Sequence, residues 1–289
     1  MLTLLLAFSE VRSTASAGIV YQTDFDSLDL GQTTSYPGSP GQGGWMQNGA
    51  DGDAFGEIQD SIANGGRALH EHTASTLQTG LQTIDSRFVG PVSLANVGVV
   101  SLSIDFYGSS SDLSAVNSFS GAFYAVGGPH PGFQIIGFEL VAGNGAPKSD
   151  TGLNIKLDAF DGLDNNGPIP LNVGQNLAWN EWHTASLSID QRTDTWLSIT
   201  VDGQTQSLLG YAPMRSFDGP DALRGQLIER LDAQISPDNL GGTSTNDDVY
   251  FDNIRLSTTV VPEPASTWIL LGVGALALAG VRRRSLGNK

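Results

Sequence analysis

The sequence predicts an all-β protein built as an antiparallel sandwich, and three observations support this prediction. The composition is rich in Gly, Ser, Thr, Asn and Asp, with 36 glycines among 289 residues, which favours turns over long helices. Residues 100–107 alternate between apolar and polar, as expected for a strand with one face in a core. Residues 180–203 show the same alternation on both sides of a turn, which indicates a long antiparallel pair.

The other expected strands are short and are separated by turn-forming residues. In chain order, the predicted strands cover residues 19–25, 54–59, 67–72, 100–107, 119–126, 133–141, 153–160, 182–189, 196–201, 204–208 and 249–256. Residues 222–231 are ambiguous, because Leu223, Leu227 and Ile228 fall at helical spacing. This segment is predicted to be either a short amphipathic helix or a helix that runs into a strand.

The segment from Trp182-His183 to Asp202-Gly203 resembles the core signature of concanavalin A-like jelly rolls, the sandwiches of lectins, laminin-G domains and glucanases. Residues 249–256 resemble the closing strand of such domains. The resemblance spans most of residues 18–257. It implies an antiparallel jelly-roll β-sandwich in which the closing strand lies beside the opening strand around Phe25.

The C-terminal tail combines three features in a fixed order. Val261-Pro262-Glu263-Pro264 is expected to be an extended linker, because proline fixes φ and lacks a backbone donor. Residues 265–281 carry no charge and suit a short transmembrane helix of about 25 Å. Arg282, Arg283 and Arg284 then resist translocation, so residues 282–289 are expected to form a cytoplasmic basic tail.

This tail resembles the PEP-CTERM sorting signal of Gram-negative bacteria. The resemblance implies that an exosortase-type enzyme processes the tail at the inner membrane. The protein would then be delivered to the cell envelope or to an exopolysaccharide matrix. The alternative is an ordinary C-terminal anchor that follows a proline-containing linker, residues 258–264.

The N-terminus has the pattern of an export signal. Residues 2–8 are an apolar run, and Ala15-Ser16-Ala17 fits a signal-peptidase site, so residues 1–17 are predicted to be a signal peptide. The usual basic segment is missing, which indicates a signal truncated by a misplaced start. A disordered N-terminal extension of a cytosolic protein is the alternative.

Charge and cysteine content narrow the possible functions. Residues 18–264 hold nine Lys and Arg against 29 Asp and Glu, a net charge of about −20. Such a surface repels phosphate backbones, so nucleic acid is not expected as a partner, whereas neutral glycans and divalent cations remain possible. The chain has no cysteine, which excludes disulfides, zinc thiolate sites and thiol nucleophiles.

Carbohydrate binding requires aromatic rings on an accessible face, together with polar partners. Strict alternation places several rings on polar strand faces or beside them. The candidates are Tyr107, Tyr124, Trp179, Trp182 and Trp196. The alternative is that these rings pack under crossing loops.

The sequence does not display a catalytic set. Glycoside hydrolysis needs two carboxyl groups about 5 to 9.5 Å apart. The strands around Glu57 and Asp105 each lack the Glu, Asp and Glu alternation of jelly-roll glucanases, and the basic residues that a lyase would cluster are scattered. We therefore expect an exported, non-catalytic envelope or matrix protein. A lectin-like module is the alternative, and a glycan hydrolase or lyase is less favoured.

Two kinds of metal site, calcium and zinc, come under consideration. Asp24, Asp26 and Asp252 are the best calcium candidates, because related domains bring the opening and closing strands together. Residues 161–166 and 51–57 are further oxygen-rich segments, and solvated turns would explain all three. His70 and His72 share one strand face, but zinc needs a third ligand and the sequence indicates none, so they are expected to be surface histidines.

Overall fold

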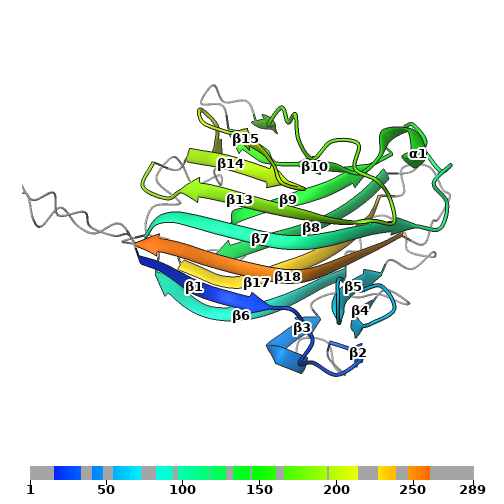
Figure 1. Ribbon diagram of the computed structural model, residues 1–289, viewed down its shortest axis with the longest axis horizontal. Coiled ribbons are helices and arrows are strands. Elements are labelled where there is room, and N and C mark those ends of the chain that lie inside the picture. The colour runs from blue at the N-terminus through cyan, green and yellow to red at the C-terminus, as the bar shows by residue number, and fades with distance from the viewer. Residues whose placement is uncertain are drawn as a thin grey trace, which may run out of the picture.

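The computed structural model describes most of the domain between the two termini. The described residues are 16–33, 41–47, 55–72, 83–93, 97–116, 118–127, 133–143, 145–160, 166–193, 195–213, 227–238 and 247–260. The predicted leader up to residue 15 and the sorting tail from Val261 onward lie outside them. Within these ranges, the protein is an all-β sandwich with almost no helix (Figure 1).

The larger sheet has nine strands in the order β15-β14-β13-β7-β18-β5-β4-β2, with β1 also paired to β18. Its strands are β1 (Ser16–Thr23), β2 (Gly31–Gln32), β4 (Phe55–Gln59), β5 (Ala68–His72), β7 (Val97–Ser110), β13 (Trp182–Asp190), β14 (Thr195–Val201), β15 (Gln204–Ser207) and β18 (Asp247–Val260).

The smaller sheet has six strands in the order β10-β9-β8-β17-β6-β3. Its strands are β3 (Trp45–Gln47), β6 (Thr83–Ser93), β8 (Ser118–Gly127), β9 (Phe133–Ala142), β10 (Asn154–Lys156) and β17 (Leu227–Asp238). A three-stranded sheet joins β11 (Asp158–Phe160), β12 (Asn166–Pro168) and β16 (Ala212–Pro213), and the described helical turns are η1 (Gln42–Gly44) and α1 (Lys148–Thr151).

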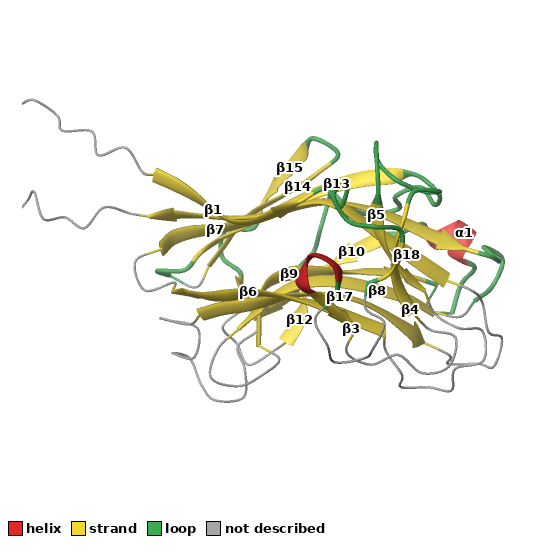
Figure 2. Cartoon of the chain, turned by 90° about the horizontal axis from the view of Figure 1, so that it is seen from below, coloured by secondary structure: helices red, strands yellow, loops and turns green. Residues whose placement is uncertain are grey.

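The two large sheets stack face to face, as Figure 2 shows from the side. One apolar core fills the space between them, because alternate residues of each strand point inward. On β7, for example, Leu102, Ile104 and Phe106 are fully buried. This arrangement confirms the predicted antiparallel jelly-roll sandwich.

Strand β18 lies at the centre of the larger sheet and has three neighbours. It pairs with β7 along one edge. Along the other edge, its first half pairs with β5 and its second half with β1, which confirms that the opening and closing strands lie side by side. The change of partner coincides with Asn253, which has a φ of 48°. The first half of β18 therefore places its outward side chains beside those of β5.

The structure differs from the predicted elements in three places. Residues 227–238 form strand β17, so the helical spacing within 222–231 does not give a helix there. Strand β6 was not expected, and the predicted strand 153–160 is divided between β10 and β11. Within the described residues, no helix is sufficiently long and apolar to span a bilayer.

Candidate functional site

The candidate site is a row of side chains that crosses five adjacent strands of the larger sheet. Glu57 of β4 lies opposite His70 of β5, and His70 lies opposite Tyr250 of β18. Tyr250 in turn lies opposite Tyr107 of β7, which lies opposite Trp182 of β13. We call these five residues the outer row.

The outer row faces away from the smaller sheet. Residues that flank its members along each strand, such as Leu69, Phe106 and Phe251, are fully buried in the core. Because neighbouring side chains of a strand point to opposite faces, the members of the outer row must point outward. Tyr107 and Trp182 are partly exposed, whereas His70 and Tyr250 retain only 8% and 5% exposure.

Four of the five side chains form a continuous aromatic strip. The rings of His70 and Tyr250 stack with centroids 4.3 Å apart. Tyr250 meets Tyr107 edge-on at 5.5 Å, and Tyr107 meets Trp182 at 5.6 Å. These separations follow from the spacing of about 4.8 Å between neighbouring strands, which fixes the strip on the rigid sheet.

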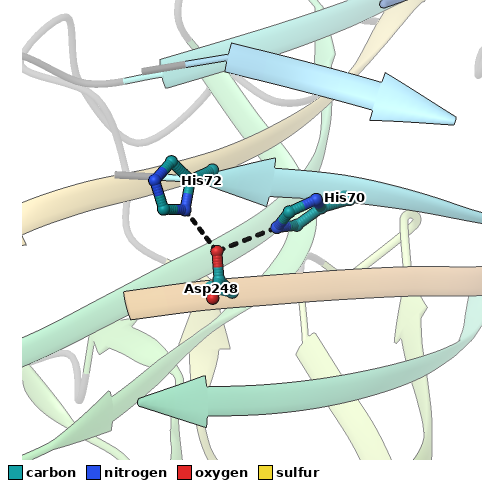
Figure 3. Close-up of side chains that lie close together, drawn as sticks. All are labelled: His70, His72 and Asp248. Atoms are coloured by element: carbon teal, nitrogen blue, oxygen red, sulfur yellow. Dashed lines mark hydrogen bonds and ion pairs between the residues drawn. The ribbon is translucent and has the colours of Figure 1, made fainter. Parts of the chain in front are cut away.

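One end of the outer row is a cluster of imidazole and carboxylate groups. Nε2 of His70 lies 2.8 Å from Oδ1 of Asp248, and Nδ1 of His70 lies 3.2 Å from Oε1 of Glu57. His72 also directs Nδ1 at Oδ1 of Asp248. Figure 3 shows both imidazole rings directed at this single carboxylate oxygen.

The environment shifts the titration of this cluster. Burial opposes protonation of His70, but its hydrogen bonds to Asp248 and Glu57 outweigh burial and raise its pKa. Burial alone would raise the pKa of Asp248, yet His70 and His72 lower it to about 2. Burial and the charge of Asp248 raise the pKa of Tyr250, so its hydroxyl keeps its proton at neutral pH.

A second polar group lies next to the outer row, where β5 and β1 meet along β18. Asp105 accepts hydrogen bonds from Thr184 (2.6 Å), Asn64 (2.7 Å) and Asn253 (2.8 Å). Its cross-strand neighbour Asp252 is almost fully buried. Burial, with smaller contributions from the charges of Asp105 and Asp26, raises the pKa of Asp252 to about 7.

Asp26 lies near enough to Asp252 for its charge to act on it, but Asp24, Asp26 and Asp252 do not bring three ligand atoms within 4.8 Å of one another. Asp24 and Asp26 are exposed, and Oδ1 of Asp26 accepts a hydrogen bond from the backbone of Arg67. Within the described part of the chain, the three His, Cys, Asp or Glu side chains whose ligand atoms lie within 4.8 Å of one another are His70, His72 and Asp248. The predicted segment 161–166 lies largely outside the described residues.

The five predicted sugar-binding aromatic residues separate into three locations. Only Tyr107 and Trp182 belong to the outer row. Trp179 packs edge-on against Phe119, and its Nε1 donates to the carbonyl oxygen of Lys148. Tyr124 lies on β8 of the smaller sheet, where it is buried and donates to Glu139.

Trp196 requires a correction. Strict alternation along its strand places it on the polar face, but the side chain is 3% exposed and belongs to the core. The cause is a register shift between Ser188 and Ile189 of β13, which sets Trp196 opposite Ile189. Such an irregularity turns one side chain to the other face of the sheet.

Two residues of the site, Asp248 and Tyr250, were missed as functional candidates. Glu57 was considered only within the oxygen-rich segment 51–57 and as a carboxylate of the glucanase type. Asp248 and His72 are 176 positions apart in the sequence. The sequence shows two histidines on one strand face, but no local pattern reveals that the closing strand pairs with that strand. His70 and His72 are therefore not isolated surface histidines, because Asp248 joins them.

A separate hollow of about 870 Å³ lies beside strands β8 to β10 of the smaller sheet. Glu139, Asn154 and Lys156 contribute to its wall. Lys156 donates to Glu139 at 2.9 Å, and Tyr124 donates to the same carboxylate at 3.0 Å. The carboxylate of Glu139 is thus paired within the wall of this hollow.

Comparison with known proteins identifies both the tail and the fold. Residues 260–284 match the family model described as the PEP-CTERM protein-sorting motif. No curated protein shows significant sequence similarity to the chain. Among solved structures, a carbohydrate esterase from the Shiga toxin-encoding bacteriophage phi24B aligns with 84% of this chain and 99% of its own, at 15% identity and a TM-score of 0.50.

Two other solved structures of similar shape are lyases. An endo-β-1,4-glucuronan lyase from the fungus Trichoderma reesei aligns over 84% of this chain and 96% of its own, with 12% identity and a TM-score of 0.49. An alginate lyase from Chlorella virus aligns over 83% and 100%, with 16% identity and a TM-score of 0.46.

These comparisons correct the expectation of a non-catalytic protein. That expectation rested on the lack of a catalytic set within any one predicted strand. The sandwich found here aligns with a solved carbohydrate esterase, and the polar cluster is assembled across strands, where the sequence does not display it. The described part of the chain is an antiparallel jelly-roll sandwich, and residues 260–284 match the PEP-CTERM sorting motif, which marks an exported, envelope-directed protein.

Proposed function

We propose that this protein processes a polysaccharide that lies along the outer row. The observation that carries this proposal is the aromatic strip itself, which runs from Trp182 to His70 across four paired strands and ends in ionisable groups. Sugar rings present apolar faces that stack on aromatic side chains, and polar groups at the side fix their orientation. Tyr107 and Trp182 are the partly exposed rings on which sugars would stack, and the largely buried His70 and Tyr250 lie at the end of the strip.

The charge of the domain favours a neutral or esterified glycan. Residues 18–264 have a net charge of about −20. Three of their carboxylates, those of Glu57, Asp105 and Asp248, lie on the outer face next to the strip. A polyuronate would be repelled by these carboxylates. We therefore place neutral polysaccharides, and those whose acid groups are esterified, first among the substrates.

The reaction assigned to the site breaks a glycosidic C–O bond. A base takes a proton either from the carbon next to an esterified acid group, which leaves a double bond, or from an attacking water molecule, and an acid gives a proton to the departing sugar oxygen. His70 is held by two carboxylates and is the base, because one of its nitrogens can accept a proton when the ring is neutral. Tyr250 is the proton donor, since its raised pKa keeps the hydroxyl protonated. The two rings are stacked 4.3 Å apart, so both can reach the same linkage.

The sorting motif supports a place for this activity outside the cytoplasm. We propose that residues 265–281 hold the protein temporarily in the inner membrane, with residues 282–289 in the cytoplasm. An exosortase-type enzyme then processes the tail and releases the domain to the envelope or the exopolysaccharide matrix.

Structural calcium at Asp24, Asp26 and Asp252 is a further proposal, and a thermal midpoint unchanged by calcium and by chelator would refute it.

The experiment is a product assay on a panel of neutral, esterified and acidic polysaccharides. New reducing ends measure cleavage of any kind, and ultraviolet absorbance from unsaturated sugars distinguishes elimination from hydrolysis. Tyr250→Phe is expected to lower the rate about 100-fold or more. Tyr124→Phe, which removes a hydroxyl from the other sheet, is the matched control and should retain the rate.

Two results would overturn the proposal. Binding without product on the whole panel would reduce the protein to a lectin. Equal rates for the Tyr250→Phe and Tyr124→Phe proteins would show that the chemistry lies elsewhere on the molecule.

A further inference from the structure

We propose that His70, His72 and Asp248 bind a divalent transition-metal ion of the zinc type. The three side chains bring Nε2, Nδ1 and Oδ1 within 4.8 Å of one another. Two imidazoles and one carboxylate are a ligand set that zinc takes in sites with an open position. This inference concerns binding of the metal alone and is tested without a glycan. While the ion is bound, Nε2 of His70 is a ligand, so His70 does not act as the base proposed above.

The ligands lie on the rigid part of the molecule. His70 and His72 project from the same face of β5, and Asp248 lies directly opposite His72 on β18. A site built on paired strands holds its ligands more closely than one built on loops. In a tetrahedral site with bonds of about 2.0 Å, ligand atoms are about 3.3 Å apart, so the 2.8 Å between His70 and Asp248 must widen only slightly.

Glu57 supplies the supporting contact that metal-binding histidines usually have. It lies 3.2 Å from Nδ1 of His70, the nitrogen that faces away from Asp248. Accepting a proton from this nitrogen leaves Nε2 as the metal ligand and fixes the orientation of the ring. The stack with Tyr250 holds the ring from its face.

The composition of the cluster decides the class of metal. Calcium and magnesium prefer six or more oxygen ligands, whereas imidazole nitrogen suits zinc, copper, nickel and cobalt. The cluster offers two nitrogens and is still partly open to solvent at His72 and Asp248, whose side chains are each 19% exposed. Solvent access provides both an entry route and a fourth ligand.

The described part of the chain contains another His–Asp pair, His183 and Asp202, which lacks the ligand set of the His70 cluster. His183 directs Nδ1 at Asp202 at 2.8 Å, and its Nε2 lies 2.9 Å from the carbonyl oxygen of Ala178. Among the described residues no second imidazole joins this pair, so it offers a metal one ring nitrogen and one carboxylate instead of two nitrogens and a carboxylate. The metal would bind at the His70 cluster and not at His183.

The proposed metal site lies next to the outer row. Asp248 precedes Tyr250 by two residues on β18, so both side chains point outward next to each other. The open position therefore lies at the end of the aromatic strip. A bound ion there would polarise an oxygen of a glycan or activate a water molecule next to it.

The test is a titration of the untagged, chelator-treated full chain with Co²⁺, followed by displacement with Zn²⁺. We expect one ion per chain, the visible absorption of four-coordinate cobalt, and loss of that signal on adding zinc. Asp248→Asn and His72→Gln should each weaken binding at least 100-fold, and Glu57→Gln should weaken it about 10-fold to 100-fold.

Asp202→Asn is the matched control, since it removes a carboxylate from the other His–Asp pair and should bind as the unaltered protein does. Circular dichroism checks that each variant is folded. If one of the three site variants is unfolded, the metal affinities of the other two test the site. Lack of stoichiometric binding, or equal affinity in the Asp248→Asn, His72→Gln and Asp202→Asn proteins, would refute the site. Metal binding without glycan processing would refute only the proposed function.

Discussion

The polar side chains on the two faces of strand β5 lie in different surroundings. On the outer face, His70 and His72 share Asp248 and sit at the edge of solvent. On the inner face, Glu71 is fully buried between the sheets, and neither of its carboxylate oxygens has a hydrogen-bond partner among the described residues. The histidines of the outer face share a carboxylate close to solvent, where they can bind a ligand. The buried carboxyl group of Glu71 on the inner face, unpaired within the described part of the chain, lowers the stability of the fold.

Burial raises the pKa values of the two inner carboxyl groups, Glu71 and Asp85, which favours their protonated forms. Burial raises the pKa of Glu71 well above its ordinary value, and the charge of Asp85 on β6 raises it further. Asp85 is also fully buried, and burial raises its pKa to about 6 against a smaller opposing effect of Thr33. A buried carboxyl group is far less costly when neutral than when ionised.

The largest expected effect comes from truncating the inner, apolar side of β5. Leu69→Ala should lower the free energy of unfolding by about 2–5 kcal/mol, because it leaves a cavity in the core. His72→Ala, three positions later on the outer face, should cost less than about 1 kcal/mol. Denaturant titration of both variants measures the difference, and similar losses would contradict the assignment of faces.

The next effect concerns pH. As pH rises from about 4 to about 6, the unfolded chain releases the proton of Asp85 first, because the folded-state pKa of Asp85 is raised from 3.8 to about 6. The free energy of unfolding should therefore fall by about 3 kcal/mol over this window and become independent of Asp85 above it. Denaturant titrations across the window should show a smaller slope for Asp85→Asn, and an unchanged slope would disprove the effect.

The smallest expected effect tests how closely the inner carboxyl group is packed. A Cβ placed on Gly56 of β4 would come within 2.1 Å of Oδ2 of Asp85. Gly56→Ala should therefore cost about 1–3 kcal/mol by overpacking. Because Asp85→Ala removes the obstructing group, the double variant should lose less than the sum of the single losses. Simple additivity in thermal unfolding would exclude this contact.

Local alternation was sufficient to predict much of the sandwich from the sequence. Residues 100–107 and 182–189 alternate cleanly, and both are strands with the predicted faces inward. The prediction fails where polar residues point inward. Strand β6 places Asp85 toward the interior, so its sequence lacks the alternation that marks a strand.

Register irregularities explain the other failures. A shift between Ser188 and Ile189 turns Trp196 into the core. A second shift, between Ile228 and Arg230, disrupts the two-residue period of β17 and leaves a spacing that resembles a helix. Neither shift has a local signature in the sequence.

The site was only partly predictable for a different reason. The sequence shows that Tyr107 and Trp182 share polar faces and that His70 and His72 share one strand face. What unites them is the order of strands β4, β5, β18, β7 and β13 in the sheet. Pairing between strands so far apart in sequence depends on the whole fold, and no short motif specifies it.

The central claim is that the outer row divides into a binding end and a reacting end. Steady-state kinetics on the polysaccharide identified in the product assay tests this claim most directly. Trp182→Ala should raise KM about 10-fold while leaving kcat nearly unchanged, since it removes a stacking surface. Tyr250→Phe should lower kcat about 100-fold or more with little change in KM. If both variants retain the original kcat and KM, or if both lose the same parameter by the same factor, the outer row does not work as described.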